Sequence, residues 1–194
     1  MNLANLLTCS RAVLAVFVAY FLFSPLPFGR FVALFLFIVA SLTDYWDGVV
    51  AREMGEVSQL GQLLDPIADK ALTLAAFLSF WKLGLLPFWM VACVLVRDLL
   101  VTGARLFLTR DARAQSPRHS GKQKTAIQLL FIIAVLLYLI ARELPTWQEP
   151  WNDTAVFLIH IGMWVIVVMT LFSGVRVLIK NVVKGSAPQT RRGT

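Results

Sequence analysis

Six apolar segments, each long enough to cross a bilayer as a helix, make up most of this chain. They run over residues 6–24, 29–51, 62–81, 86–108, 125–142 and 154–178. Charged residues account for only 15% of the sequence, whereas soluble domains carry roughly a quarter. The sequence therefore predicts an all-α, polytopic integral membrane protein with six transmembrane helices.

The polar breaks between these segments are short, so we expect one membrane domain over residues 1–183. The last stretch, 184–194, is rich in Gly, Ser, Pro and Arg and is predicted to be a flexible basic tail. The first apolar segment is too long for the core of a signal peptide and has no basic segment before it, so we interpret it as a retained helix.

Lysine and arginine residues are distributed unevenly between the two sides of these segments. If the N-terminus is cytoplasmic, only Arg30, Lys82 and Arg142 lie on the outer side. Because cytoplasmic loops of membrane proteins carry the excess of basic residues, both termini are predicted to be cytoplasmic. A bacterial inner membrane is expected, since no organelle-targeting extension is present. The cytoplasmic set comprises Arg11, Arg52, Arg105, Arg110, Arg113, Arg118, Lys122, Lys124, Arg176, Lys180, Lys184, Arg191 and Arg192.

Four aspartates lie at the cytoplasmic ends of the second and third segments. Asp44 and Asp47 are three residues apart and Asp65 and Asp69 are four apart, so each pair shares a helix face. The short polar stretch 52–60 would place the two helices antiparallel and side by side, with the four carboxylates converging. Carboxylates near membrane depth need a neutralising cation, and oxygen ligands favour Mg²⁺ or Mn²⁺. A pair of such ions is suited to phosphoryl transfer.

Two glycines and an arginine accompany the carboxylates. Gly48 and Gly61 lie on the turn side of the aspartates, where we expect close backbone approach to a ligand; helix packing is the alternative. Arg52 lies one turn past Gly48 and is placed to hold a phosphate oxygen bidentately. The alternative for Arg52 is an ordinary basic residue that extends toward the membrane surface.

Other functions remain open from the residues alone. The acidic cluster could be a solvated loop, or it could line a path for divalent cations, since intramembrane acids also serve transport. Transport is less favoured because the acids lie at one end of the helices and no second acidic layer follows. Zinc or iron chemistry is not expected, because His119 and His160 are isolated and no His/Cys cluster exists.

The spacing D-x-x-D-G-x-x-A-R-x8-G-x-x-x-D-x-x-x-D resembles the signature of the CDP-alcohol phosphatidyltransferase family. It is filled by Asp44, Asp47, Gly48, Ala51, Arg52, Gly61, Asp65 and Asp69. Within the family, the chain is most similar to the bacterial members that use glycerol 3-phosphate as acceptor. That similarity rests on the segments Asn5 to Arg11, Arg97 to Arg105 and Gly121 to Gln128. Asp98 departs from the pattern, because glutamate is usual there.

The resemblance implies an enzyme of phospholipid biosynthesis with CDP-diacylglycerol as the donor and CMP as a product. It implies that Asp44, Asp47 and Asp65 bind two Mg²⁺ or Mn²⁺ ions, and that Asp69 is the general base and also touches a metal ion. The acceptor hydroxyl would attack the β-phosphorus of the donor. Gly48, Ala51, Arg52 and Gly61 would bind the donor nucleotide. The family also implies a homodimer in the lipid bilayer, and no nucleic-acid partner is expected.

An acceptor that carries its own phosphate needs a basic pocket. Arg97 and Arg105 are eight residues apart and share a helix face, and Lys122 and Lys124 enter the next helix from the same side. These four residues are predicted to bind the phosphate of glycerol 3-phosphate, which would give phosphatidylglycerophosphate. A structural ion pair with an aspartate is the alternative for Arg97. Sister enzymes that use phosphatidylglycerol, inositol phosphate or serine, and a non-catalytic scaffold, are the alternative functions.

Overall fold

The computed structural model describes residues 3–54, 59–108 and 119–185, and side chains within 10–43, 70–103 and 124–174. This part of the chain is all-helical, without strands, and each helix coincides with one of the apolar segments. The flexible tail predicted over 184–194 lies almost entirely outside the described residues. The helices are α1 (Leu3–Phe23), α2 (Gly29–Met54), α3 (Gln59–Lys82), α4 (Phe88–Leu108), α5 (His119–Ala141) and α6 (Glu149–Gly185).

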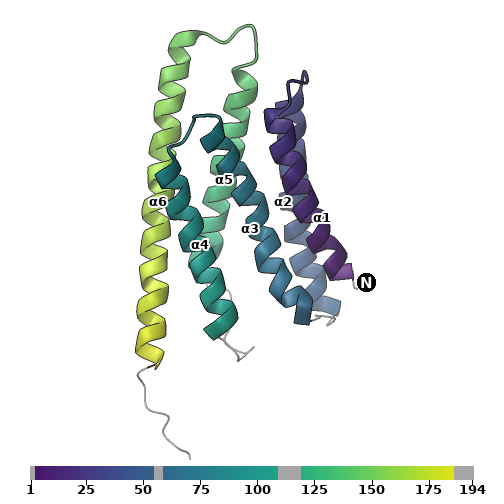
Figure 1. Cartoon of the computed structure of the whole chain (residues 1–194), viewed down its shortest axis with the longest axis vertical. Coiled ribbons are helices and arrows are strands. Elements are labelled where there is room, and N and C mark those ends of the chain that lie inside the picture. Colours follow the sequence, from purple (N-terminus) through teal and green to yellow (C-terminus); the bar gives the residue numbers. More distant parts are fainter. Residues whose placement is uncertain (1–2, 55–58, 109–118, 186–194) are drawn as a thin grey trace, which may run out of the picture.

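The six helices form an elongated bundle in which successive helices run in opposite directions (Figure 1). One end, the lower end in Figure 1, holds the starts of α1, α3 and α5 and the ends of α2, α4 and α6. The opposite, upper end holds the three short connections 24–28, 83–87 and 142–148. The helix ends that the charge distribution places in the cytoplasm therefore lie at the lower end.

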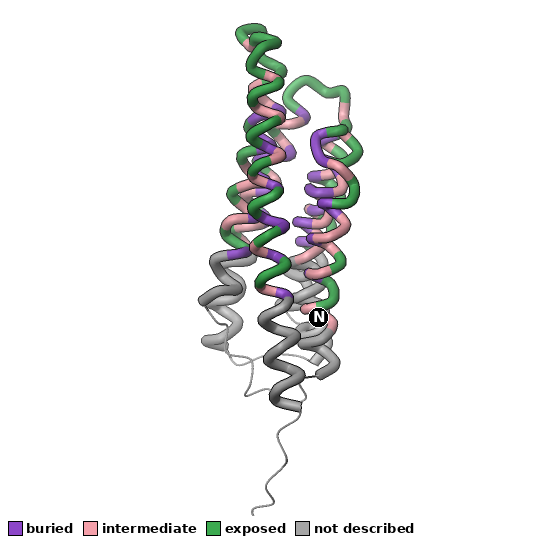
Figure 2. The backbone as a smooth tube through the Cα atoms, turned by 90° about the vertical axis from the view of Figure 1, so that its left-hand side faces the viewer, coloured by how far each residue is buried: buried purple, intermediate pink, exposed green. Residues whose placement is uncertain are grey.

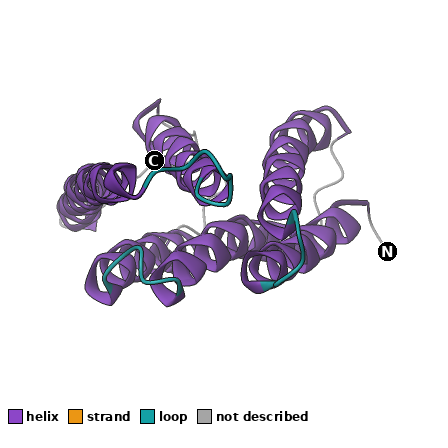
Figure 3. Cartoon of the chain, turned by 90° about the horizontal axis from the view of Figure 1, so that it is seen from above, coloured by secondary structure: helices purple, strands orange, loops and turns teal. Residues whose placement is uncertain are grey.

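α1 packs against both α2 and α3, whereas α2 and α3 touch each other sparsely within the described residues. The sequence of α1 explains this, because its buried residues Ala15, Val18 and Leu22 recur at intervals of three and four. α3 also contacts α4 and α5, and α6 covers α4 and α5 on the other side (Figure 3). α2 also packs against α5, so α2 and α3 together join α1 to the rest of the bundle.

The hydrophobic core runs along the centre of the bundle and is built largely from large side chains. Phe77 of α3 stacks on Phe131 of α5, with ring centroids 6.2 Å apart. Gly162 of α6 lies directly against this pair, since a Cβ atom there would be 2.9 Å from Cε2 of Phe131. The missing side chain lets α6 approach α5 closely, as small residues do between membrane helices.

Arg30 of α2 contacts the end of α5 at the upper end of the bundle. Its Nη1 atom donates a 3.0 Å hydrogen bond to the carbonyl oxygen of Leu139, and its Nε atom is 3.2 Å from Oε1 of Glu143. Leu139 is in the last turn of α5, where carbonyl groups lack a partner within the helix. Arg30 therefore caps α5 and connects it to the start of α2.

Large apolar side chains also cover the outside of the bundle. Phe31, Phe35, Leu100, Phe157 and Phe172 are each more than half exposed, and exposed residues follow the outer faces of the helices (Figure 2). Helices that are apolar both inside and outside belong in a membrane, so the chain is a membrane protein. Within the described residues, two stretches are long and apolar enough to span one, Lys124–Ala141 and Glu149–Gly174.

Candidate active site

The backbone at all four signature aspartates is helical. Asp44 and Asp47 lie in α2, and Asp65 and Asp69 lie in α3. The side chains of residues 44–69 are outside the described part of the chain, so the convergence of the four carboxylates remains a prediction. Only five residue steps separate the end of α2 from the start of α3, which limits the distance between these ends to about 18 Å.

The other predicted donor and acceptor residues divide into two groups. Gly48, Ala51 and Arg52 lie in α2 and Gly61 lies in α3, all at the lower end and all without described side chains. Arg105 of α4 and Lys122 of α5 likewise lie outside the described side chains. Arg97 and Lys124 are described, and both belong to one buried polar cluster.

Asp98 of α4 is the centre of this cluster, and only 6% of its surface is exposed. Its Oδ1 atom accepts hydrogen bonds from Nζ of Lys124 and, at 2.9 Å, from Nη1 of Arg97. Its Oδ2 atom is 3.8 Å from Nζ of Lys70 and 3.4 Å from Nε2 of Gln128. One carboxylate from α4 thus holds side chains from α3, α4 and α5. We refer to Lys70, Arg97, Asp98, Lys124 and Gln128 as the Asp98 cluster.

Arg97 extends from the Asp98 cluster to α6. Its Nη2 atom donates a 2.7 Å hydrogen bond to Oγ of Ser173. The next residue, Gly174, faces the arginine side chain, because a Cβ atom there would be 3.3 Å from both Cγ and Nε of Arg97. The Nε atom of Arg97 is buried without a hydrogen-bond partner among the described residues. Arg97 is ion-paired with Asp98 of its own helix; the alternative of an ion pair between Arg97 and one of the four signature aspartates involves side chains outside the described part of the chain.

The described part of the cluster carries excess positive charge. Lys70, Arg97 and Lys124 are cationic, and Asp98 is the one carboxylate that the described residues place among them. The excess is two positive charges in a largely buried place, where unbalanced charge is costly. Such an arrangement is suited to binding an anion with two negative charges.

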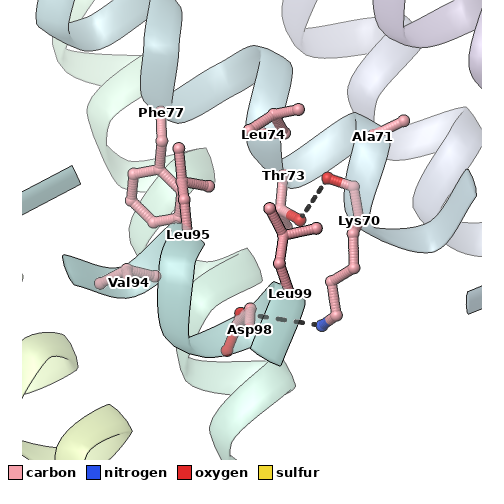
Figure 4. A pocket seen from close by; sticks show the side chains of 9 residues that line it. All are labelled: Lys70, Ala71, Thr73, Leu74, Phe77, Val94, Leu95, Asp98 and Leu99. Carbon is pink, nitrogen blue, oxygen red and sulfur yellow. Dashed lines mark hydrogen bonds and ion pairs between the residues drawn. The ribbon is translucent and has the colours of Figure 1, made fainter. Parts of the chain in front are cut away.

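A cavity of about 120 Å³ lies beside the cluster, between α3 and α4. Lys70 reaches from α3 toward Asp98 on α4 at one end of it, while Leu74, Phe77 and Val94 supply apolar walls (Figure 4). The side chain of Lys70 is 28% exposed, against 9% for Lys124. Lys70 also makes the longest of the three described contacts with Asp98.

Lys70, Gln128 and Ser173 were not predicted to belong to the site, and Asp98 was noted only as a departure from the family pattern. A signal for two of them was present. Lys70 and Asp98 are charged residues inside apolar segments, and such residues need a partner of opposite charge. Nothing in the sequence indicated that α6 would contribute Ser173, because serine is common in membrane helices.

The chain matches a family model described as CDP-alcohol phosphatidyltransferase over residues 1–175. It is 33% identical over 192 residues to the CDP-diacylglycerol–glycerol-3-phosphate 3-phosphatidyltransferase of Bacillus subtilis (strain 168), covering 93% of this chain and 95% of that protein. It is 36% identical over 159 residues to a protein of the same name from Cereibacter sphaeroides, covering 76% and 72%. A probable phosphatidylglycerophosphate synthase from Mycobacterium tuberculosis (strain H37Rv) is 39% identical over 138 residues, covering 68% and 64%.

Proposed function

Because this chain belongs to the CDP-alcohol phosphatidyltransferase family, we propose that it transfers the phosphatidyl group of CDP-diacylglycerol to glycerol 3-phosphate. The products are phosphatidylglycerophosphate and CMP. The names of its curated relatives support this choice of donor and acceptor. The proposal extends to a bacterial inner membrane crossed six times, with the lower end of the bundle in the cytoplasm, and to a homodimer.

The Asp98 cluster is the observation that carries the choice of acceptor. Its three cations exceed its one described carboxylate by two charges, and the phosphate monoester of glycerol 3-phosphate carries about two negative charges at neutral pH. Serine has no phosphate, and phosphatidylglycerol carries a singly charged diester. Inositol phosphate has the same charge as glycerol 3-phosphate, so the charge of the cluster does not distinguish the two acceptors. Separate CMP-release reactions with each acceptor distinguish them. Arg97 and Lys124 bind the acceptor phosphate, with Arg105 and Lys122 nearby on the same helices.

The signature aspartates supply the ligands for a metal site. Asp44, Asp47, Asp65 and Asp69 offer only carboxylate oxygens, a donor set that fits Mg²⁺ or Mn²⁺, and enzymes of this family are generally metal-dependent. Two ions, when bound, neutralise the donor diphosphate and stabilise the charge that develops on the leaving group. Transport of the same cations is the alternative for these residues.

The residues of α2 and α3 perform the chemistry around this site. Gly48, Ala51 and Gly61 leave room for the cytidine nucleotide, and Arg52 holds an oxygen of the diphosphate. Asp69 accepts the proton from the acceptor hydroxyl as the hydroxyl oxygen attacks the β-phosphorus of the donor. A new bond forms between the hydroxyl oxygen and the β-phosphorus. The bond between the β-phosphorus and the bridging oxygen breaks, and its electron pair leaves on the α-phosphate of CMP.

CMP release by the purified protein in detergent, with CDP-diacylglycerol and Mg²⁺, tests this function. Separate reactions contain glycerol 3-phosphate, phosphatidylglycerol, inositol phosphate or serine. Release with glycerol 3-phosphate alone is the expected result. Release with a different acceptor alone would retain the family and refute the acceptor. If the folded protein released no CMP in any reaction but carried Mg²⁺ into liposomes, the transport alternative would replace the proposal.

A further inference from the structure

We propose that Asp98 is a positioning residue for the acceptor, which holds Lys70, Arg97 and Lys124 in the arrangement that binds the acceptor phosphate. This inference rests on the proposed function. It adds a role for Asp98, and a third phosphate-binding cation in Lys70, to the residues proposed above. The four side chains come from three helices, so no single helix can set their relative positions.

The geometry of the carboxylate supports this role. Asp98 uses Oδ1 for Lys124 and Arg97 and presents Oδ2 to Lys70 and Gln128. Three cations brought this close together repel one another unless an anion lies between them. Asp98 holds them together before the acceptor arrives, and the two positive charges by which the described cations exceed Asp98 are available to the phosphate. Binding then requires little rearrangement of the cations, which is the general benefit of preorganisation.

The contact with Lys70 extends this effect toward the reacting centre. Lys70 directly follows Asp69, the proposed general base, and adjacent Cα atoms are about 3.8 Å apart. Because α4 holds Lys70 through Asp98, the position of the acceptor phosphate is tied to the segment of α3 that carries the base.

Asp98→Asn separates positioning from simple charge compensation, because the two roles predict opposite changes. Among the described residues, removing the negative charge raises the excess from two positive charges to three. If Asp98 only offset positive charge, the variant would bind glycerol 3-phosphate more tightly. If Asp98 positions the cations, the KM for glycerol 3-phosphate rises about tenfold or more, a typical effect of losing charge-assisted hydrogen bonds. The KM for CDP-diacylglycerol then stays within about twofold of wild type, since no donor-binding residue is altered.

The experiment measures both KM values, kcat and Tm for wild type, Asp98→Asn and Asp98→Glu. The glutamate restores the carboxylate and is expected to bring the KM for glycerol 3-phosphate to within about threefold of wild type. Glu143→Gln is the matched control, because it removes the carboxylate of an arginine ion pair at the upper end and leaves both KM values unchanged. Gln128→Met removes an uncharged donor to Asp98 and raises the same KM about threefold; it replaces Asp98→Asn as the test if that variant does not fold.

An unchanged or lower KM for glycerol 3-phosphate in Asp98→Asn would overturn the inference. So would an Asp98→Asn variant in which both KM values, kcat and Tm are impaired alike, if Asp98→Glu did not restore them. An unchanged KM in Gln128→Met, where that variant serves as the test, would also overturn it. Failure of the proposed function is distinguishable, because the wild-type protein itself would then release no CMP with glycerol 3-phosphate.

Discussion

Lys124 of α5 donates a hydrogen bond to the carboxylate of Asp98 on α4, a residue 26 positions earlier in the chain. Both side chains are buried, and Arg97 and Lys70 approach the same carboxylate. Polar side chains in this setting must satisfy one another or bind an ion. The contact between Lys124 and Asp98 therefore connects the packing of the bundle to its chemistry.

Replacing Asp69 with asparagine tests the proposed base. The amide cannot accept a proton, so kcat falls about 100- to 10,000-fold, the usual contribution of general base catalysis. Binding of CMP, measured by calorimetry, is retained because the other three aspartates and Arg52 remain. Asp153→Asn at the start of α6 is the control and keeps full activity. Wild-type turnover by the Asp69 variant would show that another group is the base.

Removing divalent metal ions should abolish CMP release. The four signature carboxylates and the donor diphosphate are all anionic, so without a cation they repel one another at the site. Treatment with a chelator is expected to stop the reaction, and Mg²⁺ or Mn²⁺ should restore it. Added K⁺ at matched ionic strength serves as the control and restores nothing. Undiminished activity after thorough chelation would argue against the metal site.

Lys70→Met and Lys124→Met should differ in stability but agree in their effect on the acceptor. Each change removes one cation from the proposed phosphate site, so each raises the KM for glycerol 3-phosphate about tenfold. Lys124 also donates a buried hydrogen bond to Asp98, and losing such a bond costs about 1.5–3 kcal/mol. Tm therefore falls more for Lys124→Met, since Lys70 is 3.8 Å from the carboxylate and more exposed. Equal losses of Tm would contradict the assigned geometry.

Gly174→Ala should impair acceptor binding through Arg97. The new Cβ atom would be 3.3 Å from Cγ and Nε of Arg97, so the arginine must shift by a few tenths of an ångström. A displacement of this size in a binding group is expected to raise the KM for glycerol 3-phosphate about three- to tenfold. Gly103→Ala on α4 is the matched control, because no atom of the described residues lies within 4 Å of its Cβ position. If both variants behaved alike, the contact would have no role in binding.

Gly162→Ala should lower stability without changing either KM. Its Cβ atom would lie 2.9 Å from Cε2 of Phe131, and overpacking of this kind costs about 1–3 kcal/mol. The better helix propensity of alanine offsets about 1 kcal/mol of that cost. Thermal unfolding followed by circular dichroism measures the difference. Adding Phe131→Leu should recover part of the lost Tm, and no recovery would mean that the strain lies elsewhere.

The helices and the family could be predicted from the sequence because each depends on local patterns. Apolar length located all six helices, and the spacing of eight residues within 44–69 indicated the family. The packing of α1 against both α2 and α3 was not predicted, since its apolar residues do not specify a partner. Six membrane crossings and cytoplasmic termini remain predictions.

The acceptor side of the site was predicted only in part, because it depends on contacts between distant residues. Arg97 and Lys124 were identified by their charge and by the family pattern, and the structure places both in one cluster. The partner that brings them together, Asp98, depends on the long side chain of Lys124 reaching from α5 to α4. Ser173 joins from α6, 76 positions from Arg97, and no periodicity in the sequence relates the two.

The Asp98 cluster has a consequence for how the protein is made. The family signature is complete by Asp69, within the first three helices, whereas the contacts of Arg97 extend to Ser173 near the end of the sixth. During synthesis, the nascent chain therefore carries every signature carboxylate long before it can assemble the cationic pocket. A chain terminated after α5 would carry the family's signature but lack the α6 support for Arg97.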